Sequence, residues 1–227
     1  MCGKFTQRVG WDGAISFEDL ATADSASLET ITPMRFAGVI HLDGSGNRKN
    51  TRMRWGLVPS DAQDPLIGTK FIHARAETVE QKPTFRENFF QRRGILPIHT
   101  FNEGEELTPR KTLQYIVTPR DGLPIGIAVI WDVWTAPNGA QLVTYAMVTT
   151  PANELIGKIT DRMPAVIPSE HWAKWLGEEA ATLDQLKGLL VPLKGDWDMH
   201  PAGKPPPPPP PPKLKKPDRS PYQPDLF

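Results

Sequence analysis

Cys2 is the only cysteine among the 227 residues of the chain, and it directly follows the initiator methionine. A single cysteine cannot form a disulfide within the chain. Because initiator methionine is normally removed before a small residue, we expect Cys2 to carry a free α-amine as well as its thiol. Such a 1,2-aminothiol condenses with an aldehyde to an imine, and the thiol then closes a five-membered thiazolidine ring. The alternative is that Cys2 is simply a small residue at a frayed terminus.

The overall charge does not indicate a partner, because Lys+Arg and Asp+Glu both total 26. The distribution of charge says more. Residues 48–93 contain ten Lys or Arg against five Asp or Glu. This local excess suits a phosphate backbone, and a solvated face with scattered charge is the alternative interpretation.

The sequence indicates a cytoplasmic protein. It has no apolar run of membrane-spanning length, and MCGKFTQRVG lacks the hydrophobic stretch of a signal peptide. A single cysteine fits a reducing compartment. We expect no metal site and no cofactor, since neither a cysteine cluster nor a spaced histidine pair occurs.

The elements that must position Cys2 are mainly strands. Residues 53–58, 93–98, 113–119, 125–134 and 141–150 are rich in β-branched or aromatic residues and are bounded by turn residues. Fewer segments favour helices: 15–23, a helix beginning at Pro83, residues 170–176 with Ser169 as the cap, and 183–190. The pattern predicts an α+β fold with a curved antiparallel sheet or barrel-like core and interspersed helices.

The composition changes near Gly203, where an octaproline, Pro205 to Pro212, begins a polar tail. Such a run adopts polyproline II and acts as a semi-rigid spacer. The tail lacks the apolar content needed to fold. We therefore predict one domain over residues 1–200 and a disordered tail over 201–227.

Five segments together resemble the SOS-response-associated peptidase (SRAP) family. They are MCGKF (1–5), RWGLVPS (54–60), HARAETVEQKPTFR (73–86), TTPANELIGKITDRMPAVI (149–167) and HWAKWL (171–176). They occur in the family's order and cover most of residues 1–176. No single segment is specific, but five in sequence are hard to produce by chance.

The resemblance implies what Cys2 does. Family members form a thiazolidine between their N-terminal cysteine and the ring-opened deoxyribose of an abasic site in single-stranded DNA, which gives a DNA–protein crosslink. Cys2 would be the nucleophile through its nitrogen and its sulfur. Glu103, by its position, matches the family glutamate that shuttles protons during imine formation. The alternative is that Glu103 belongs to a solvated acidic loop with Glu105 and Glu106.

The chain departs from the family pattern at two positions of the site. It has His73 where the family usually has asparagine, and Thr160 where the family usually has histidine. One hypothesis is that His73 or His99 supplies the missing imidazole, since histidine shuttles protons at neutral pH. The alternative is that His73 is a hydrogen-bonded structural residue. In that case crosslinking is slow, or the protein binds DNA without linking to it.

The same motifs suggest DNA contacts. Arg75, Arg86 and Arg162 match positions of phosphate contacts, and the forked guanidinium suits phosphate. For Arg162 the alternative is an internal ion pair with Asp161 or Glu77. Trp55 and Pro59 are candidates for stacking on bases or wedging between them, with core packing as the alternative for Trp55.

The last five residues, QPDLF, resemble the bacterial sliding-clamp-binding motif. Leu226 and Phe227 would be its apolar anchors, and Gln223 would bind at the rim of the clamp pocket. The octaproline has a second possible use, as a ligand of a proline-binding module.

The sequence therefore predicts a cytoplasmic, nucleoid-associated sensor of abasic sites in single-stranded DNA, tethered to a sliding clamp and acting in the DNA damage response. Three alternatives stay open. The protein is an abasic-site lyase that acts through a Cys2 imine, a non-catalytic module that binds single-stranded DNA and the clamp, or a peptidase, as the family name suggests. Against a peptidase, the sequence shows no recognisable Ser/Cys–His–Asp set.

Overall fold

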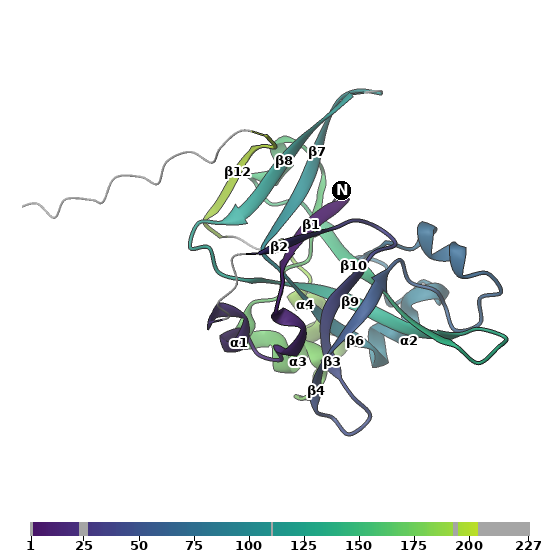
Figure 1. Ribbon diagram of the computed structural model, residues 1–227. Helices are drawn as coiled ribbons and strands as arrows, with labels where there is room; N and C mark the ends of the chain where they lie inside the picture. The colour runs from purple at the N-terminus through teal and green to yellow at the C-terminus, as the bar shows by residue number, and fades with distance from the viewer. Residues whose placement is uncertain (1, 23–26, 110, 193–194, 204–227) are drawn as a thin grey trace, which may run out of the picture.

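Strands dominate the computed structural model, which describes residues 2–22, 27–109, 111–192 and 195–203 (Figure 1). The strands are β1 (Lys4–Arg8), β2 (Leu28–Ile31), β3 (Phe36–Leu42), β4 (Arg48–Trp55), β5 (His73–Arg75), β6 (Arg93–Ile98), β7 (Thr100–Thr108), β8 (Lys111–Pro119), β9 (Ile125–Thr135), β10 (Gln141–Pro151), β11 (Arg162–Pro164) and β12 (Trp197–Pro201). The α-helices are α1 (Phe17–Thr22), α2 (Pro83–Gln91), α3 (Trp172–Leu176) and α4 (Leu183–Leu189). Four 3₁₀ turns join them within the described residues: η1 (Trp11–Gly13), η2 (Pro65–Lys70), η3 (Ile156–Lys158) and η4 (Ser169–His171).

Five strands close into a barrel in the order β10, β4, β3, β6 and β9, with β9 pairing back onto β10. The pairing of β10 with β4 is parallel, and the other four pairings of the ring are antiparallel. Closure leaves these strands without a free edge. The far end of β10 also pairs with β5 and β11, so β10 contacts four other strands.

The second sheet is antiparallel, in the order β12, β8, β7, β1 and β2. Phe5 of β1 lies opposite Phe101 of β7 and Ile31 of β2, and all three are buried. This face packs on the barrel strands and encloses one of two hydrophobic clusters, which also contains Cys2, Trp55 and Tyr145. Figure 1 shows β7 and β8 rising beyond the barrel as a long hairpin.

The helices cover the other hydrophobic cluster. Trp172 and Trp175 of α3 are fully buried, and Trp175 Nε1 donates to the Gly94 carbonyl of β6. Trp172 lies so close to Gly126 of β9 that a Cβ added there would sit 2.6 Å from the indole ring. Glycine is therefore required at this contact between helix and sheet.

The structure confirms the α+β class and the barrel-like core. The predicted strands 93–98, 113–119, 125–134 and 141–150 correspond to β6, β8, β9 and β10, and a helix does begin at Pro83. Two details were wrong. The strand predicted over 53–58 ends at Trp55, because Gly56 adopts a φ of 126°. Ser169 lies inside η4 and does not cap α3, which begins at Trp172.

The octaproline and the QPDLF motif lie outside the described residues. Among the residues that the structure does describe, none of the helices is long and apolar enough to cross a membrane.

Candidate active site

One face of β10 organises the site. Side chains alternate along a strand, so residues 145, 147 and 149 share a face. Their register partners are Trp55 on β4 and His73 and Arg75 on β5. The three partners therefore project from the same face of the sheet, spaced over about 13 Å. Arg162, opposite residue 151, continues this row.

Cys2 reaches this face from the second sheet. It lies two residues before Lys4, the first residue of β1. The register of β1 with β7 pairs Lys4 with Asn102 and so brings Cys2 beside Glu103. The Glu103 carboxyl interacts with the Cys2 backbone through a hydrogen bond. The Cys2 sulfur lies 3.5 Å from the Lys4 carbonyl oxygen, to which the thiol donates. Cys2 is 1% exposed and Glu103 is 0% exposed, so the pair sits in a medium of low dielectric.

Burial controls the protonation of both groups. Burial raises the pKa of the Cys2 thiol well above its usual range, and the nearby Glu103 charge raises it further. Burial also raises the pKa of Glu103 to about 7, although the hydrogen bond from the Cys2 backbone acts in the opposite direction. A carboxyl with this pKa both holds and releases a proton near neutral pH. Because Glu103 is buried within β7, the alternative of a solvated acidic loop does not hold.

His73 lies beside Cys2, and its imidazole ring forms a hydrogen bond with the Cys2 backbone. Burial lowers the pKa of His73 to about 4, against the raising effect of the Cys2 contact, so the ring is neutral at pH 7. Its Nε2 atom is buried and has no hydrogen-bond partner among the described residues.

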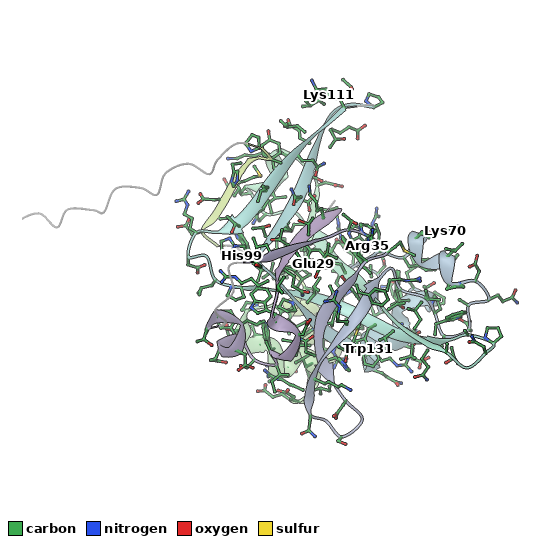
Figure 2. All side chains as sticks on the ribbon, in the orientation of Figure 1. Glu29, Arg35, Lys70, His99, Lys111 and Trp131 are labelled. Atoms are coloured by element: carbon green, nitrogen blue, oxygen red, sulfur yellow. The ribbon has the colours of Figure 1, made fainter. Side chains whose placement is uncertain are left out.

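His99, unlike His73, does not lie beside Cys2. Its backbone N–H donates to the Thr6 carbonyl, and it lies four residues before Glu103, about 13 Å along the strand. Figure 2 labels both His99 and Glu29, and Glu29 pairs with Gln7, toward the end of β1 that lies away from Cys2. Of the two imidazoles considered as substitutes, His73 is the one next to Cys2.

Trp55 is a packing residue. Its side chain is 0% exposed, and its indole Nε1 donates to the Ile72 carbonyl at 2.8 Å. The ring meets His73 edge-on at 5.9 Å and lies parallel to the Tyr145 ring at 6.5 Å. The prediction that Trp55 stacks on bases does not fit this complete burial. Trp55 instead fixes the orientation of two rings near Cys2.

A groove of about 660 Å³ opens over His73. It is lined by Lys70, Phe71, His73, Arg75, Glu77, Thr78, Lys82, Thr84, Phe85 and Arg162. Four of these side chains are cationic and one is acidic. Phe71 and Phe85 meet edge-on at 5.8 Å, so the groove also offers aromatic surface. Cationic and aromatic side chains together are typical of sites that bind single-stranded nucleic acid. Lys70, labelled in Figure 2, is the last residue of η2.

Arg162 is held by an internal ion pair. Its two terminal nitrogens lie 2.5 and 3.0 Å from the carboxylate oxygens of Glu77, and one also donates to the Thr149 carbonyl at 2.7 Å. Arg162 lowers the pKa of Glu77. Of the two roles considered for Arg162, the structure shows the ion pair, with Glu77 rather than Asp161. The guanidinium also lines the groove.

The groove lining does not include the buried Cys2, Glu103 and Trp55, nor the predicted site residues Pro59, Arg86 and Thr160. Pro59 lines a separate hollow of about 380 Å³ with Asn88 and Asp132. Arg86 is exposed on α2. Thr160 is half-buried after η3, and its neighbour Asp161 contributes to raising the pKa of Glu103.

Sequence reasoning missed several residues at the site. The groove residues Lys70, Phe71, Lys82 and Phe85 were not singled out, although the local excess of Lys and Arg over residues 48–93 includes both lysines. No signal in the sequence indicated Tyr145. Among the described residues, no three His, Cys, Asp or Glu side chains gather as metal ligands would.

The sequence is similar to a known family and to several named proteins. A family model described as SOS response associated peptidase (SRAP) matches residues 1–204. The abasic site processing protein YoqW of Bacillus subtilis is 34% identical over 200 residues, covering 86% of this chain and 89% of YoqW. The abasic site processing protein HMCES of Xenopus tropicalis is 28% identical over 173 residues, covering 66% of this chain and 51% of HMCES.

Two solved structures share the fold. A protein from Bordetella bronchiseptica superposes with a TM-score of 0.71 at 22% identity, covering 88% of this chain and 99% of that one. A protein from Bacteroides thetaiotaomicron gives a TM-score of 0.69 at 24% identity, with 76% of each chain covered.

Proposed function

Because the chain belongs to the SOS response associated peptidase family, we propose that it recognises abasic sites in single-stranded DNA and links to them covalently through Cys2. The observation that carries this proposal is the burial of Glu103, with a pKa of about 7, against Cys2 near a cationic groove. The names of the relatives YoqW and HMCES, both abasic site processing proteins, support it.

The proposed reaction begins at the α-amine of Cys2, once Met1 has been removed. The amine adds to the C1′ aldehyde of the ring-opened sugar and gives a carbinolamine. Protonated Glu103 donates a proton to the departing hydroxyl, which leaves as water. The Glu103 carboxylate then takes the N–H proton of the resulting iminium, and the neutral imine forms. The Cys2 sulfur then bonds to the imine carbon while the thiol proton ends on the nitrogen. The product is a thiazolidine, and Glu103 is regenerated.

Neutral His73 has a supporting role in this scheme. Its contact with the Cys2 backbone holds the reacting residue against Glu103, and its buried Nε2 offers one further hydrogen-bonding position at the site. With a pKa of about 4, the ring is not the main proton carrier at neutral pH. Glu103 has the better-matched pKa.

The groove is the proposed track of the DNA strand. Arg75, Lys70 and Lys82 would meet phosphates, while Phe71 and Phe85 would offer stacking surface to bases. Arg162, held by Glu77, would add its charge beside Arg75. The strand would then pass directly over His73 and reach Cys2.

Arg75→Ala tests this track. Arg75 is exposed at the end of β5 and lines the groove. The variant is expected to bind abasic single-stranded DNA about tenfold more weakly and to lower the slope of log K against log salt by about 0.7. Fluorescence anisotropy at several salt concentrations measures both. Arg120→Ala is the matched control, because Arg120 is exposed in the turn after β8 of the other sheet and pairs with Asp198. Equal losses in both variants would contradict the track.

The test of the proposed function uses single-stranded DNA with one abasic site and, as the control, the same strand with an intact base. A denaturing gel is expected to show a shifted band with the abasic strand only, and intact mass is expected to show that Met1 is absent. Strand cleavage without a stable adduct would instead indicate lyase chemistry through the imine. If neither adduct nor cleavage appears although Met1 is removed, the protein is a non-catalytic DNA-binding module.

We also propose that the QPDLF segment tethers the protein to a sliding clamp and so places it at the nucleoid and at replication forks. Leu226 and Phe227 would occupy an apolar pocket of the clamp, with Gln223 at its rim. Deletion of residues 223–227 is expected to abolish retention on an immobilised clamp while crosslinking to free DNA continues at the wild-type rate. Retention without these residues would rule the tether out.

A further inference from the structure

We propose that the Tyr145 hydroxyl is a positioning group for the Cys2 sulfur and donates a hydrogen bond to it as the thiazolidine ring closes. This inference rests on the proposed function. It concerns the second bond formed by Cys2, the S–C bond, and not the imine.

The geometry around Tyr145 supports this role. Tyr145 lies on the face of β10 that carries the site, directly in register with Trp55. Its ring is nearly parallel to the Trp55 ring, with an interplanar angle of 7°. It belongs to the same packed cluster as Cys2, and both side chains are buried. The ring therefore has little freedom to turn its hydroxyl away from this cluster.

The hydroxyl oxygen of Tyr145 is buried and has no hydrogen-bond partner among the described residues. Buried polar groups are normally paired, and an unpaired one costs stability. The Nε2 atom of His73 is likewise buried and has no hydrogen-bond partner among the described residues. His73 projects from the same face and contacts the same Trp55 ring. Two buried polar atoms near the reacting residue thus lack partners within the part of the chain that the structure describes, as expected if their partner forms only during the reaction.

The chemistry of ring closure supplies that partner. When the thiol proton leaves, the sulfur gains negative charge in a buried place, where burial already opposes the thiolate. A donor at the sulfur offsets this cost. Burial raises the pKa of Tyr145 well above its usual range, and the charge of Cys2 raises it further, so the hydroxyl keeps its proton and stays a donor. Tyr145 gives up no proton overall, and the thiol proton still ends on the thiazolidine nitrogen.

The test is Tyr145→Phe, with Tyr115→Phe as the matched control. The Tyr115 hydroxyl donates to Glu105 and is therefore already paired, and Tyr115 lies opposite Glu103 in the register of β7 and β8. Imine formation is followed by borohydride trapping at early times on abasic single-stranded DNA. Ring closure is followed as the crosslink that survives a denaturing gel without borohydride. In Tyr145→Phe we expect trapping within about twofold of wild type and ring closure about tenfold slower, the effect of one hydrogen bond to a charged group. Tyr115→Phe is expected to match wild type in both.

A thermal melt separates this role from a structural one. Removal of an unpaired buried hydroxyl is expected to leave the Tm of Tyr145→Phe unchanged or higher. Slower closure in a protein of equal stability supports the positioning role. Closure at the wild-type rate would overturn it, and so would an equal slowing of trapping and closure.

A third measurement needs no DNA. Cys2 is the sole cysteine, so the rate of alkylation by iodoacetamide at about pH 8 reports on its sulfur alone. The rate is expected to fall in Tyr145→Phe and to stay at the wild-type value in Tyr115→Phe. If wild type forms no adduct with abasic DNA, the proposed function fails. The alkylation rates then test the contact between Tyr145 and the Cys2 sulfur without DNA. Equal rates in wild type and Tyr145→Phe would overturn it.

Discussion

Glu103→Gln is expected to slow imine formation about 100-fold, which is the usual range for loss of a general acid–base group. Glutamine has nearly the same shape and an oxygen that accepts the hydrogen bond from the Cys2 backbone, but it does not exchange a proton. The loss therefore isolates proton transfer from packing. Borohydride trapping of the Cys2 imine on abasic single-stranded DNA measures the rate. A variant that traps the imine as fast as wild type would remove Glu103 from the mechanism.

The pH profile gives a sharper form of this prediction. The amine must be neutral to attack, so the rate rises with pH through the ordinary range of an α-amine, about 7.7–8.0. Glu103 must be protonated to release water, so its contribution falls as pH rises through about 7. Wild type should therefore show a maximum between these limits. In Glu103→Gln the falling limb is expected to disappear, and the rate rises to a plateau.

The free energy of unfolding is also expected to depend on the titration of Glu103. The pKa of Glu103 is raised from 4.5 to about 7 in the folded chain, so folding favours the protonated form. That contribution is fully present below about 4.5 and is lost as pH rises through 7. Above neutral pH, wild type is expected to be destabilised by on the order of 3 kcal/mol relative to acid. Glu103→Gln should not show this decline in a urea titration at several pH values.

The strands that sequence reasoning found are those whose own residues favour a strand. Residues 125–134 are almost continuously β-branched or apolar, and β9 is indeed a barrel strand buried over most of its length. β7 is different, because its sequence TFNEGEELT contains residues that are depleted in strands. Its conformation depends on pairing with β1 and β8, which lie far away in the sequence or across a turn. The burial of Glu103 followed from that pairing and was therefore not predictable.

Some features of the candidate site were likewise predictable from the sequence, and others depended on the fold. The chemistry of Cys2 followed from its residue type and position alone. The ion-pair partner of Arg162 could not be predicted from the sequence, because its neighbour Asp161 and the distant Glu77 were both plausible partners. Folding places residue 77 after β5, next to β11 across the end of β10, and Glu77 is the partner. Trp55, His73 and Arg75 share a face only through the two parallel pairings of β10, and no local pattern records those pairings.

Cys2→Ala is expected to abolish the crosslink that survives a denaturing gel without borohydride. Alanine is small enough for Met1 to be removed, so the α-amine remains and an imine still forms. The sulfur that would close the ring is gone. The imine then has two fates, hydrolysis back to the aldehyde or elimination, and elimination cleaves the strand. We therefore expect borohydride trapping to persist and cleavage to increase while the stable adduct disappears.

Cys2→Leu completes this comparison, because a large residue at position 2 is expected to retain Met1 and to block the amine at the site. An apolar side chain also suits the buried position of Cys2. Intact mass checks that Met1 is retained, and a thermal melt checks the fold. This variant should give neither trapping, nor cleavage, nor a stable adduct. A stable adduct in Cys2→Ala would show that another nucleophile makes the bond. Loss of every product in Cys2→Leu, with trapping and cleavage kept in Cys2→Ala, would show that the amine is needed for both outcomes. The contrast between wild type and Cys2→Ala would then show that the sulfur decides between protecting and cutting the strand.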